Sequence, residues 1–459
     1  MDVQRYSTPE NGIGTGAPGA STVAPWIAPV AAGPLDATLR LPGSKSLTNR
    51  ELVLAALAAG PGTLHAPLHS RDSALMIAGL RALGVGIDET ENITEYGPDL
   101  RVTPAPLVGG RSIDCGLAGT VMRFLPPVAA LANGPVEFDG DESARRRPMS
   151  AMIGALRDLG IETDDNGRGG MPFTLHGTGT VAGGEVSIDA SASSQFVSGL
   201  LLAAARFERG LVLRHTGERL PSLPHIEMTI TCLQQRGVEV KTPTPGTWVV
   251  EHQAIRALDV SIEPDLSNAA PFLVAALISG GTVAVEGWPR ATTQVGAMLA
   301  DLLPRYGARV SWRGDALVVD GGIGIRGGAE IPGLDLDLSA GGELAPAIVA
   351  LAALASTPSR IIGIGHLRGH ETDRLAALAT EIVSLGGQVT ELDDGLLIEP
   401  RPLHGGRWHA YEDHRMATAG AILGLAVPGV KVDDIATTAK TLPQFAELWA
   451  VTTKAIAAS

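Results

Sequence analysis

The most constraining feature of this chain is a local pattern that returns five times: an amphipathic helix, then a glycine, then a short strand. The glycines are Gly84, Gly160, Gly237, Gly307 and Gly386, with 76, 77, 70 and 79 residues between consecutive copies. Glycine past a helix end is a common left-handed cap, so one instance alone means little. Five instances at nearly constant spacing are typical of a repeated α/β unit. The sequence therefore predicts an α/β protein with two or three such units in each domain.

Composition limits how these units can form a core. The chain has 459 residues, of which 45% are hydrophobic but only 4% are aromatic, and it contains 57 glycines. This length exceeds one ordinary hydrophobic core, so two or three domains are expected. Their cores must be built mainly from Ala, Leu, Val and Ile on many short elements joined by glycine-rich turns.

Charge and cysteine usage narrow the class of protein. The net charge of −14 argues against nucleic acid or an anionic membrane as the main partner. Residues 1–24 are rich in Gly, Pro, Ser and Thr, which predicts a flexible tail rather than a signal peptide. Cys115 and Cys232 lack the spacing of a disulfide framework or a zinc site and are interpreted as small core residues. No apolar run approaches the ~20 residues that span a bilayer, so a cytoplasmic protein is expected.

The segment 41–50 has the features of an anion-binding helix start. A Pro-Gly turn leads into the apolar stretch 52–59, which is predicted to be helical. Free backbone N–H groups and the positive end of the helix dipole attract anions at such a start. It is not a Walker A loop, because Ser44 stands where that motif has glycine. Taken alone, an ordinary capped helix explains the segment equally well. Its first turn carries two cations and two hydroxyls: Lys45, Ser46, Thr48 and Arg50.

Two further polar segments precede apolar helices. Gly119 lets a ligand approach the backbone just before the helix predicted over 125–132. Three polar residues, Ser193, Ser194 and Gln195, precede the helix predicted over 197–205. Serines in this position are most often caps, but three consecutive polar groups exceed what capping requires. Both segments are therefore candidate anion sites.

Charged motifs follow in a chain that is otherwise short of cations. The segment 368–374 joins a histidine, a carboxylate and an arginine at a helix start, and the segments 411–416 and 438–443 add further cations. The arginine run 145–147 follows acidic residues and is interpreted as a solvated face except for its last member. The residues singled out are Arg147, His370, Glu371, Arg374, Arg415 and Lys440.

Together these segments resemble the family of 5-enolpyruvylshikimate-3-phosphate synthases, or 3-phosphoshikimate 1-carboxyvinyltransferases. Eight segments of the chain match the family's motifs in order across residues 41–443. The resemblance implies a two-domain inside-out α/β barrel, the enolpyruvyl transferase fold, with three βαβαββ-like units around buried helices in each domain. It places the first, discontinuous domain at 25–42 and 264–459, the inserted second domain at 43–263, and the active site in the cleft between them.

The resemblance also implies the reaction and its binding residues. The enolpyruvyl group of phosphoenolpyruvate would pass to the 5-hydroxyl of shikimate 3-phosphate, releasing phosphate, on the pathway to chorismate and aromatic amino acids. The residues implied for shikimate 3-phosphate are Lys45, Ser46, Arg50, Ser193, Ser194, Gln195, Ser222, Glu343 and His370. Those implied for phosphoenolpyruvate are Lys45, Gly119, Arg147, Gln195, Arg374, Arg415 and Lys440. Several cations in a closed cleft suit two polyanionic substrates, because low dielectric strengthens each contact.

Catalysis requires one group that takes the hydroxyl proton and another that protonates the methylene carbon of phosphoenolpyruvate. By family position Glu343 is the candidate base, and Glu371, with Lys45 nearby, is the candidate for proton transfer at carbon. This chemistry needs neither a metal nor an organic cofactor, and none is expected. The expected partners are the two small molecules, and the chain is expected to be a monomer. The Ala118-Gly119 pair resembles the glyphosate-sensitive form of the family, so glyphosate is expected to occupy the phosphoenolpyruvate site.

Four positions depart from the usual family pattern. Leu117 replaces Asn, Glu343 stands where many relatives have Asp, and His225 stands where relatives often have Tyr, so His225 is given no role. His370 replaces a common Lys, and a histidine there would make the charge sensitive to pH.

Two alternatives stay open at this point. The first is the sister transferase acting on UDP-N-acetylglucosamine, which typically has a loop cysteine and Lys-Asn where this chain has Lys45-Ser46. The second is a non-catalytic anion-binding α/β protein. The carboxylates Glu343 and Glu371 argue against the second, because a pure anion binder gains little from acids among its cations.

Overall fold

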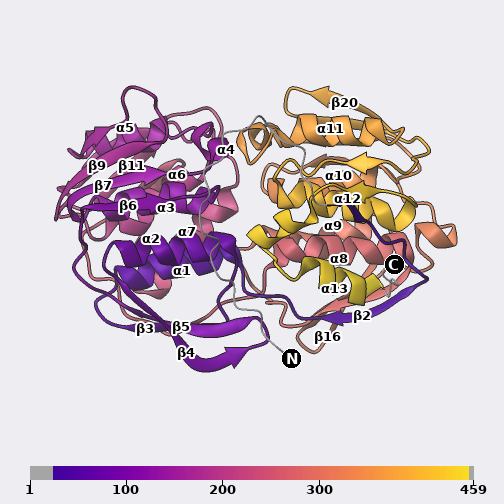
Figure 1. Cartoon of the computed structure of the whole chain (residues 1–459), viewed down its shortest axis with the longest axis horizontal. Helices are drawn as coiled ribbons and strands as arrows, with labels where there is room; N and C mark the ends of the chain where they lie inside the picture. The colour runs from indigo at the N-terminus through magenta and orange to yellow at the C-terminus, as the bar shows by residue number, and fades with distance from the viewer. Residues whose placement is uncertain (1–23, 454–459) are drawn as a thin grey trace.

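The structure, a computed structural model, describes residues 24–453, so only the last residue of the predicted tail falls within the described chain. The elements form two lobes that stand side by side (Figure 1). Buried apolar side chains form two separate clusters, one from 28–41 and 266–449 and the other from 52–255. We call the lobe around the first cluster the first domain. The other lobe is the second domain, for which the predicted limits 43–263 serve as working boundaries.

Three four-stranded sheets with one shared strand order surround the second-domain core. In each sheet two parallel strands lie beside an antiparallel hairpin, in the orders β14-β3-β5-β4, β6-β7-β9-β8 and β10-β11-β13-β12. The strands are β3 (Gly62–His65), β4 (Gly86–Thr94), β5 (Gly97–Thr103), β6 (Arg111–Asp114), β7 (Asn133–Asp139), β8 (Glu162–Asp164), β9 (Phe173–Thr178), β10 (Gly184–Ile188), β11 (Leu211–His215), β12 (Lys241–Thr244), β13 (Thr247–Val250) and β14 (Val260–Ser261).

The helices of the second domain divide into a central set and an outer set. The central helices α1, α3 and α6 pack against one another and are buried over most of their length. α3 and α6 are largely apolar on all sides and must be enclosed in this way, whereas α1 also buries the polar residues Asn49, Arg50 and Glu51. The outer helices α2, α5 and α7 bury one face. The bounds are α1 (Lys45–Ala56), α2 (Arg71–Ala82), α3 (Gly119–Ala129), α4 (Glu142–Arg145), α5 (Ser150–Asp158), α6 (Gln195–Ala204) and α7 (Leu223–Gln235).

The first domain repeats the same plan. Two of its sheets have the order β2-β15-β17-β16 and β18-β19-β21-β20, whereas the third is the three-stranded β1-β23-β22. The strands are β1 (Trp26–Ile27), β2 (Leu35–Leu39), β15 (Gly281–Val285), β16 (Arg309–Arg313), β17 (Ala316–Asp320), β18 (Asp335–Asp337), β19 (Ser359–Ile362), β20 (Gln388–Leu392), β21 (Gly395–Glu399), β22 (Arg407–Trp408) and β23 (Lys431–Val432).

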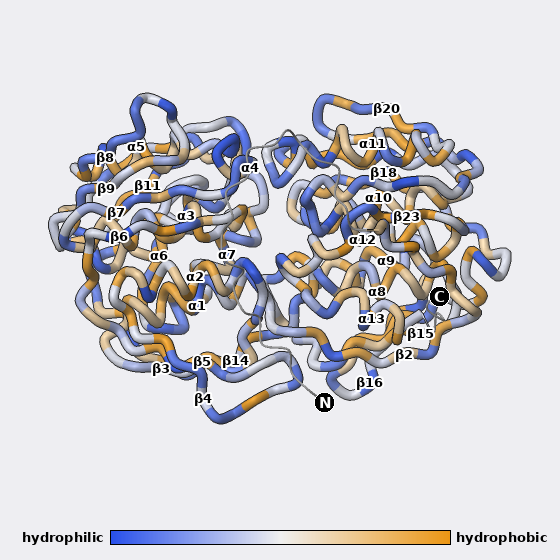
Figure 2. The backbone as a smooth tube through the Cα atoms, in the orientation of Figure 1, coloured by the Kyte–Doolittle hydropathy of each residue, from blue (hydrophilic) through white to orange (hydrophobic). Residues whose placement is uncertain are grey.

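Helices α8, α10 and α12 form the centre of the first domain and are buried over most of their length. Figure 2 shows hydrophobic segments inside each lobe and hydrophilic residues along many of the outer loops. The α-helices are α8 (Leu266–Ser279), α9 (Leu299–Arg305), α10 (Ala345–Ala352), α11 (Arg374–Ser384), α12 (His414–Ala426) and α13 (Phe445–Thr453). The short 3₁₀ turns are η1 (Val295–Met298), η2 (Ile325–Gly327), η3 (Gly342–Leu344), η4 (Gly365–Gly369) and η5 (Ile435–Lys440).

The five glycine joints predicted from the sequence are confirmed. Gly84, Gly160, Gly237, Gly307 and Gly386 have φ angles of 98°, 84°, 79°, 97° and 92°. Each follows an α-helix and precedes a strand, at the joints α2–β4, α5–β8, α7–β12, α9–β16 and α11–β20. The left-handed backbone is the physical reason for glycine at these points, because a Cβ atom would be strained there.

The predicted first turn with Lys45 is part of α1, but two other helices begin earlier than predicted. The helices predicted over 125–132 and 197–205 are α3, which already begins at Gly119, and α6, which begins at Gln195. A periodicity argument misses a first turn whose side chains face a site rather than the core. None of the helices within the described chain is long and apolar enough to cross a membrane.

Two adjacent chain segments join the domains. β2 pairs with β15 in the first domain, and β14 pairs with β3 in the second, so the chain crosses directly after β2 and after β14. At the crossing the Ser44 amide donates to the Glu263 carbonyl (2.7 Å) and the Asp265 amide donates to the Pro42 carbonyl (2.9 Å). A Cβ atom on Gly43 would lie 2.3 Å from the Ala66 carbonyl oxygen, so only glycine fits at this point.

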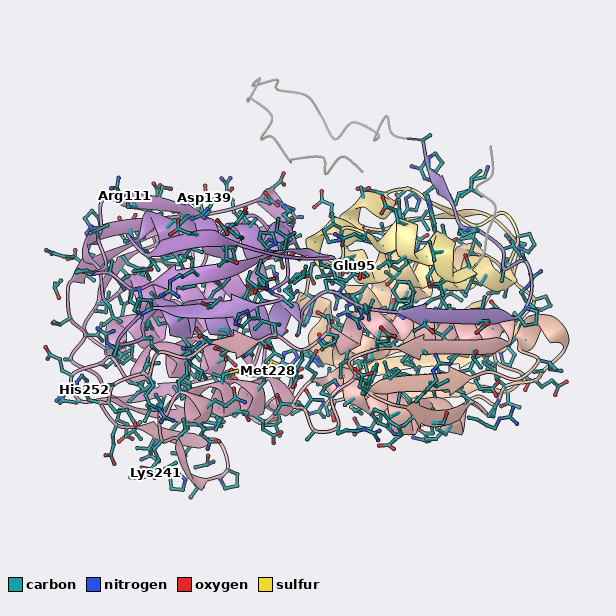
Figure 3. All side chains as sticks on the ribbon, turned by 90° about the horizontal axis from the view of Figure 1, so that it is seen from below. Glu95, Arg111, Asp139, Met228, Lys241 and His252 are labelled. Carbon is teal, nitrogen blue, oxygen red and sulfur yellow. The ribbon has the colours of Figure 1, made fainter. Side chains whose placement is uncertain are left out.

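The β4–β5 hairpin adds a further link between the domains. Glu95, between the two strands, lies at the boundary between the lobes, whereas Arg111 and His252 lie far from it (Figure 3). The Tyr96 hydroxyl donates to the Arg40 carbonyl (2.7 Å), and Arg40 pairs with Glu286 of the first domain (2.7 Å). The hairpin therefore braces the side of the molecule where the chain crosses.

Candidate active site

A cavity of about 790 Å³, including space open to solvent, lies between the two domains. The structure brings together there thirteen of the fifteen residues that were singled out from the sequence. These thirteen are Lys45, Ser46, Gly119, Arg147, Ser193, Ser194, Gln195, Ser222, Glu343, His370, Glu371, Arg374 and Arg415. Lys440 and Arg50 lie behind the lining, where each contacts residues that do reach the cavity.

Four central helices, three from the second domain and one from the first, begin at this cavity. Lys45 starts α1, Gly119 starts α3, Gln195 starts α6 and His414 starts α12, and all four line the cavity. Within the described residues no side-chain hydrogen bond caps the start of α3, whereas Ser44, Ser193 and Asp413 each accept from one N–H at the starts of α1, α6 and α12. The remaining N–H groups and the positive ends of the helix dipoles converge on one space, which favours anions there.

One corner of the cavity is built from Gly119, Arg147 and Gln195. A Cβ atom on Gly119 would lie 3.0 Å from the Gln195 Oε1 atom and 3.2 Å from both terminal nitrogens of Arg147. Arg147 is only 8% exposed, and its Nη1 donates weakly to the Leu117 carbonyl (3.4 Å). Within the described chain, Arg147 Nε and Gln195 Oε1 are buried without a hydrogen-bond partner. Unpaired buried polar atoms are costly, so this corner is suited to a ligand that completes their hydrogen bonds.

The opposite wall contains a buried ionic network around Glu371. Its Oε1 accepts from Lys440 Nζ (2.6 Å) and its Oε2 accepts from Arg374 Nη2 (2.9 Å). Arg374 is also held by Asp413, whose two oxygens lie 2.7 and 3.1 Å from the guanidinium. Asp413 is the N-cap of α12 and is fully buried. Two helix starts, α11 and α12, are thus locked together by one arginine.

Lys45 and Glu371 have contacts that the sequence did not specify. The Lys45 ammonium lies 3.5 Å from Asp72, and Lys440 and Arg374 contact Glu371 directly. Lys440, 69 residues after Glu371 in the sequence, reaches it from the end of η5. Arg50 is 1% exposed and does not line the cavity within the described chain.

The protonation of the Glu371 neighbourhood follows from burial and charge. Burial opposes ionisation of Glu371, but Lys440, Arg374 and Arg147 outweigh it and hold its pKa well below the usual range. Burial, together with the charges of Arg374 and Arg147, lowers the pKa of His370 well below its ordinary value. His370 is therefore neutral at physiological pH, and its Nδ1 lies 3.4 Å from Arg374 Nη1.

Glu343 lies in η3, directly before α10. Its partners come from α7, α8 and α12. Its Oε1 accepts from the Ser267 hydroxyl (2.6 Å) and lies 3.5 Å from His225 Nε2, and its Oε2 lies 3.6 Å from Arg415 Nη2. Burial opposes ionisation, but His225, Arg415 and Ser267 together lower the pKa of Glu343 well below its usual value. An ionised carboxylate is the form that can accept a proton.

The hydroxyl side of the cavity comes from two loops of the second domain. The Ser193 hydroxyl accepts from the Gln195 amide (3.2 Å), which fixes the turn before α6. Ser222 adopts a left-handed conformation with φ of 54° before α7, and its amide donates to the Ser339 carbonyl of the first domain (3.3 Å). A non-glycine residue at positive φ is a strained feature that often marks a site.

Histidines at the cavity were largely missed from the sequence. His225, His366 and His414 also line the cavity. Burial, then the charge of Arg374, lowers the pKa of His366 to about 4. Burial and the cations Arg415 and Lys45 lower the pKa of His414 well below its ordinary value. His414 lies inside the charged segment 411–416, so its position could have been noticed, whereas His366 is brought in only by η4.

Contacts across the cleft hold the two walls together. Lys440 Nζ donates to the Leu117 carbonyl (3.0 Å), the Ser143 hydroxyl donates to Glu412 (3.3 Å), and Arg219 pairs with Asp394 (3.1 Å). The structure is thus a closed arrangement. The Leu117 carbonyl takes part in one of these cross-domain contacts, while the Leu117 side chain is buried in the second-domain core.

Comparison with known proteins decides the family. The family model described as EPSP synthase (3-phosphoshikimate 1-carboxyvinyltransferase) matches residues 30–449. A curated 3-phosphoshikimate 1-carboxyvinyltransferase of Kocuria rhizophila is 57% identical over 431 residues, which cover 93% of this chain and 96% of the relative. The chain belongs to the EPSP synthase family. The expected family, enzyme class and pathway are therefore confirmed, and the nucleotide-sugar alternative is set aside.

Solved structures agree on the fold. An EPSP synthase of Acinetobacter baumannii superposes with a TM-score of 0.75 at 22% identity, covering 94% of this chain and 98% of that chain. The enolpyruvyl transferase NikO of Streptomyces tendae gives a TM-score of 0.72 at 18% identity, covering 94% and 97%. At such identities the likeness concerns the fold alone, and it confirms the two-domain enolpyruvyl transferase architecture expected from the sequence.

Proposed function

We propose that this cavity binds shikimate 3-phosphate and phosphoenolpyruvate together and transfers the enolpyruvyl group to the 5-hydroxyl, releasing phosphate. The observation that carries the proposal is the pair of buried, ionised carboxylates, Glu343 and Glu371, in a closed cavity otherwise built to attract anions. Two polyanions balance the cations around the cavity, and the carboxylates remain free to move protons.

The binding roles follow the two walls and their helix starts. We assign shikimate 3-phosphate to Lys45, Ser46, Ser193, Ser194, Gln195, Ser222, Glu343 and His370. We assign phosphoenolpyruvate to Lys45, Gly119, Arg147, Gln195, Arg374 and Arg415. Support comes from the cavity lining and from the unpaired atoms of Arg147 and Gln195. Arginine forks suit carboxylate and phosphate, and lysine suits a point contact.

Two predicted ligand contacts take different roles in this proposal. Lys440 acts through Glu371, whose Oε1 it holds at 2.6 Å. Arg50 supports the site from behind, because its Nη1 donates to the Ser46 carbonyl (2.8 Å) and its Nη2 donates to the His225 carbonyl (2.9 Å). All these donors point to backbone or hydroxyl groups of the second domain, so Arg50 orders the walls rather than the ligand.

In the proposed reaction the two carboxylates transfer different protons. Glu343 takes the proton of the attacking 5-hydroxyl, for which its ionised state is suited. Glu371 delivers a proton to the methylene carbon and later removes one from the methyl group as the C2–O bond to phosphate breaks, and the proton held by Glu343 passes to the departing phosphate. Entry of two polyanions raises the pKa of Glu371 by like-charge repulsion. Lys440 at 2.6 Å can then pass the proton that Glu371 hands to carbon.

We further propose a monomer that acts in the cytoplasm. Both walls of the cavity come from one chain, so the site is complete without a second copy. The negative net charge of −14 gives no basis for a nucleic-acid partner.

The test is steady-state phosphate release from phosphoenolpyruvate. We expect release that requires shikimate 3-phosphate, does not occur with UDP-N-acetylglucosamine, and survives a chelator. Release driven by the nucleotide sugar would overturn the substrate assignment. Activity lost with chelator and restored by a divalent ion would overturn the metal-free mechanism.

A further inference from the structure

We propose that His225 is a positioning residue for Glu343, reaching across the domain boundary to hold the Oε1 atom of that carboxylate. The inference rests on the proposed role of Glu343 as the base. His225 lies in the first turn of α7 in the second domain, and Glu343 lies in η3 of the first domain. His225 Nε2 and Glu343 Oε1 are 3.5 Å apart, which is ion-pair distance and slightly long for a hydrogen bond.

Hydrogen bonds fix the backbone of His225 at both its carbonyl and its amide. Its carbonyl oxygen accepts from Arg50 Nη2 (2.9 Å), from the Thr229 hydroxyl (3.0 Å) and from the Ser198 hydroxyl (3.4 Å). Its amide donates to the carbonyl of Ser222 (3.0 Å). These charged and hydroxyl donors hold the carbonyl oxygen of His225 in place. The imidazole is then the part of the residue that is available for other contacts. The buried Arg50 therefore helps to position the His225 ring, because it holds the His225 carbonyl.

Glu343 is held asymmetrically, which gives His225 a specific task. Among the described residues, Oε1 has the Ser267 hydroxyl at 2.6 Å as well as His225, whereas the partner of Oε2 is Arg415, at the longer distance of 3.6 Å. With Oε1 engaged, Oε2 keeps the lone pairs that accept a proton. Holding a base within a fraction of an ångström of its working geometry is a large contribution to rate. His225 therefore acts on kcat through Glu343.

The contact also links the base to domain closure. The adjacent hydrogen bond from the Ser222 amide to the Ser339 carbonyl (3.3 Å) joins the same two loops. Both contacts exist only when the walls meet, so Glu343 acquires its full set of partners in the closed arrangement. The charged and titratable groups that face Glu343 are His225 of α7, Arg415 of α12, Arg374 of α11, Arg50 of α1 and Asp265, the N-cap of α8.

The test compares His225→Leu, which removes both ring nitrogens, with His225→Gln, which retains an N–H donor near the Nε2 position. We expect His225→Leu to lower kcat by roughly 10- to 100-fold with less than about a threefold change in the KM of shikimate 3-phosphate. His225→Gln should recover most of kcat. His176→Leu is the matched control, since His176 is an exposed residue of β9 in the same domain, and it should change neither constant. A raised KM with unchanged kcat, or a Gln variant no better than Leu, overturns the inference.

A double-variant cycle separates positioning from an independent action on substrate. Glu343→Asp keeps a carboxylate but withdraws it from His225 by one methylene. In that background His225→Leu should have little further effect on kcat, whereas effects that multiply would overturn the inference. Thermal unfolding of each variant checks that it is folded.

A second readout needs no substrate and so separates failure of this inference from failure of the proposed function. A carbon-13 NMR titration of the Glu343 carboxyl, assigned with Glu343→Gln, should give a higher pKa in His225→Leu than in the unaltered protein. An unchanged pKa would overturn the pairing. Absence of phosphate release by the unaltered protein would overturn the proposed function but leave this titration valid.

Discussion

The second-domain wall of the cavity carries no carboxylate among the described residues, whereas the first-domain wall carries both Glu343 and Glu371. The second-domain wall offers hydroxyls, an amide, helix starts and cations, and it has one histidine, His225. The first-domain wall adds three histidines, His366, His370 and His414, to its two acids and two arginines. In the proposed mechanism, the second-domain wall therefore binds ligands, and the first-domain wall adds the groups that move protons. That mechanism needs both walls together, as in the closed arrangement.

The strongest test of this contrast removes a proton-carrying group from the first-domain wall. Glu343→Gln and Glu371→Gln keep the shape of the side chain but cannot exchange protons. Each should lower kcat by roughly 10²–10⁴-fold while the substrate dissociation constants change much less. Stopped-flow turnover and equilibrium titration measure the two quantities. Glu391→Gln, an exposed residue paired with Arg368, is the control and should be neutral. A Glu343 or Glu371 variant with near-normal kcat would remove that residue from proton transfer.

The next largest effect concerns the buried ionic network. Asp413→Asn keeps the helix cap but withdraws the charge that balances Arg374, with which Asp413 makes contacts of 2.7 and 3.1 Å. Breaking a buried pair leaves a charge uncompensated, so the free energy of unfolding should fall by about 3 kcal/mol. Urea unfolding measures it. The exposed pair of Asp335 with Arg360 supplies the control, because Asp335→Asn should cost less than about 1 kcal/mol. Equal losses in both variants would contradict the argument.

The histidines of the first-domain wall predict a loss of stability in acid. Burial and Arg374 lower the pKa of His366 to about 4 from an ordinary 6.5. Between these values the unfolded chain binds a proton that the folded protein does not, so the free energy of unfolding falls as pH decreases from 6.5 towards 4. His366 contributes up to about 3 kcal/mol to this fall. His366→Gln should reduce the pH dependence of urea unfolding, whereas the exposed His176→Gln should not. Identical pH profiles for the His366 variant and the unaltered protein would refute the assignment.

The smallest expected effect comes from adding a methyl group to the second-domain wall. Gly119→Ala places a methyl group 3.0 Å from Gln195 Oε1 and 3.2 Å from Arg147, so those side chains must shift by a few tenths of an ångström. We expect a modest rise in the KM of phosphoenolpyruvate and a larger rise, about tenfold or more, in the inhibition constant of the longer ligand glyphosate. Gly154→Ala, with open space around its Cβ position, is the control. Parallel changes in both constants would show that Gly119 does not limit the longer ligand.

Much of the fold could be predicted from local sequence. The joints at Gly84 and Gly386 were recognisable because a left-handed cap depends on a few consecutive residues. The anion-binding starts at Lys45 and Gly119 were recognisable for the same reason, since a helix start and its polar side chains are contiguous in sequence. Domain limits and the roles of individual residues came from resemblance to the family, not from pattern alone.

Partner choice within the site could not be predicted in this way. The sequence put Lys45 near Glu371 but did not show which cations contact that carboxylate; in the structure Lys440 and Arg374 do, and Lys45 pairs with Asp72. Arginine commonly binds phosphate, but the Arg50 side chain points into the second domain, where it donates to the Thr229 hydroxyl and the His225 carbonyl.

By itself, then, the sequence determined the repeated α/β units, the glycine-capped joints and the clustering of anion-binding helix starts. Each depends on propensities that act over a few neighbouring residues. Only the tertiary structure decided which cation neutralises Glu371, that His370 and His366 are uncharged, and that His225 meets Glu343. His225 and Glu343 are 118 residues apart in the sequence and belong to different domains. Such contacts, and the burial that shifts each pKa, exist only after both cores have formed and the walls have closed.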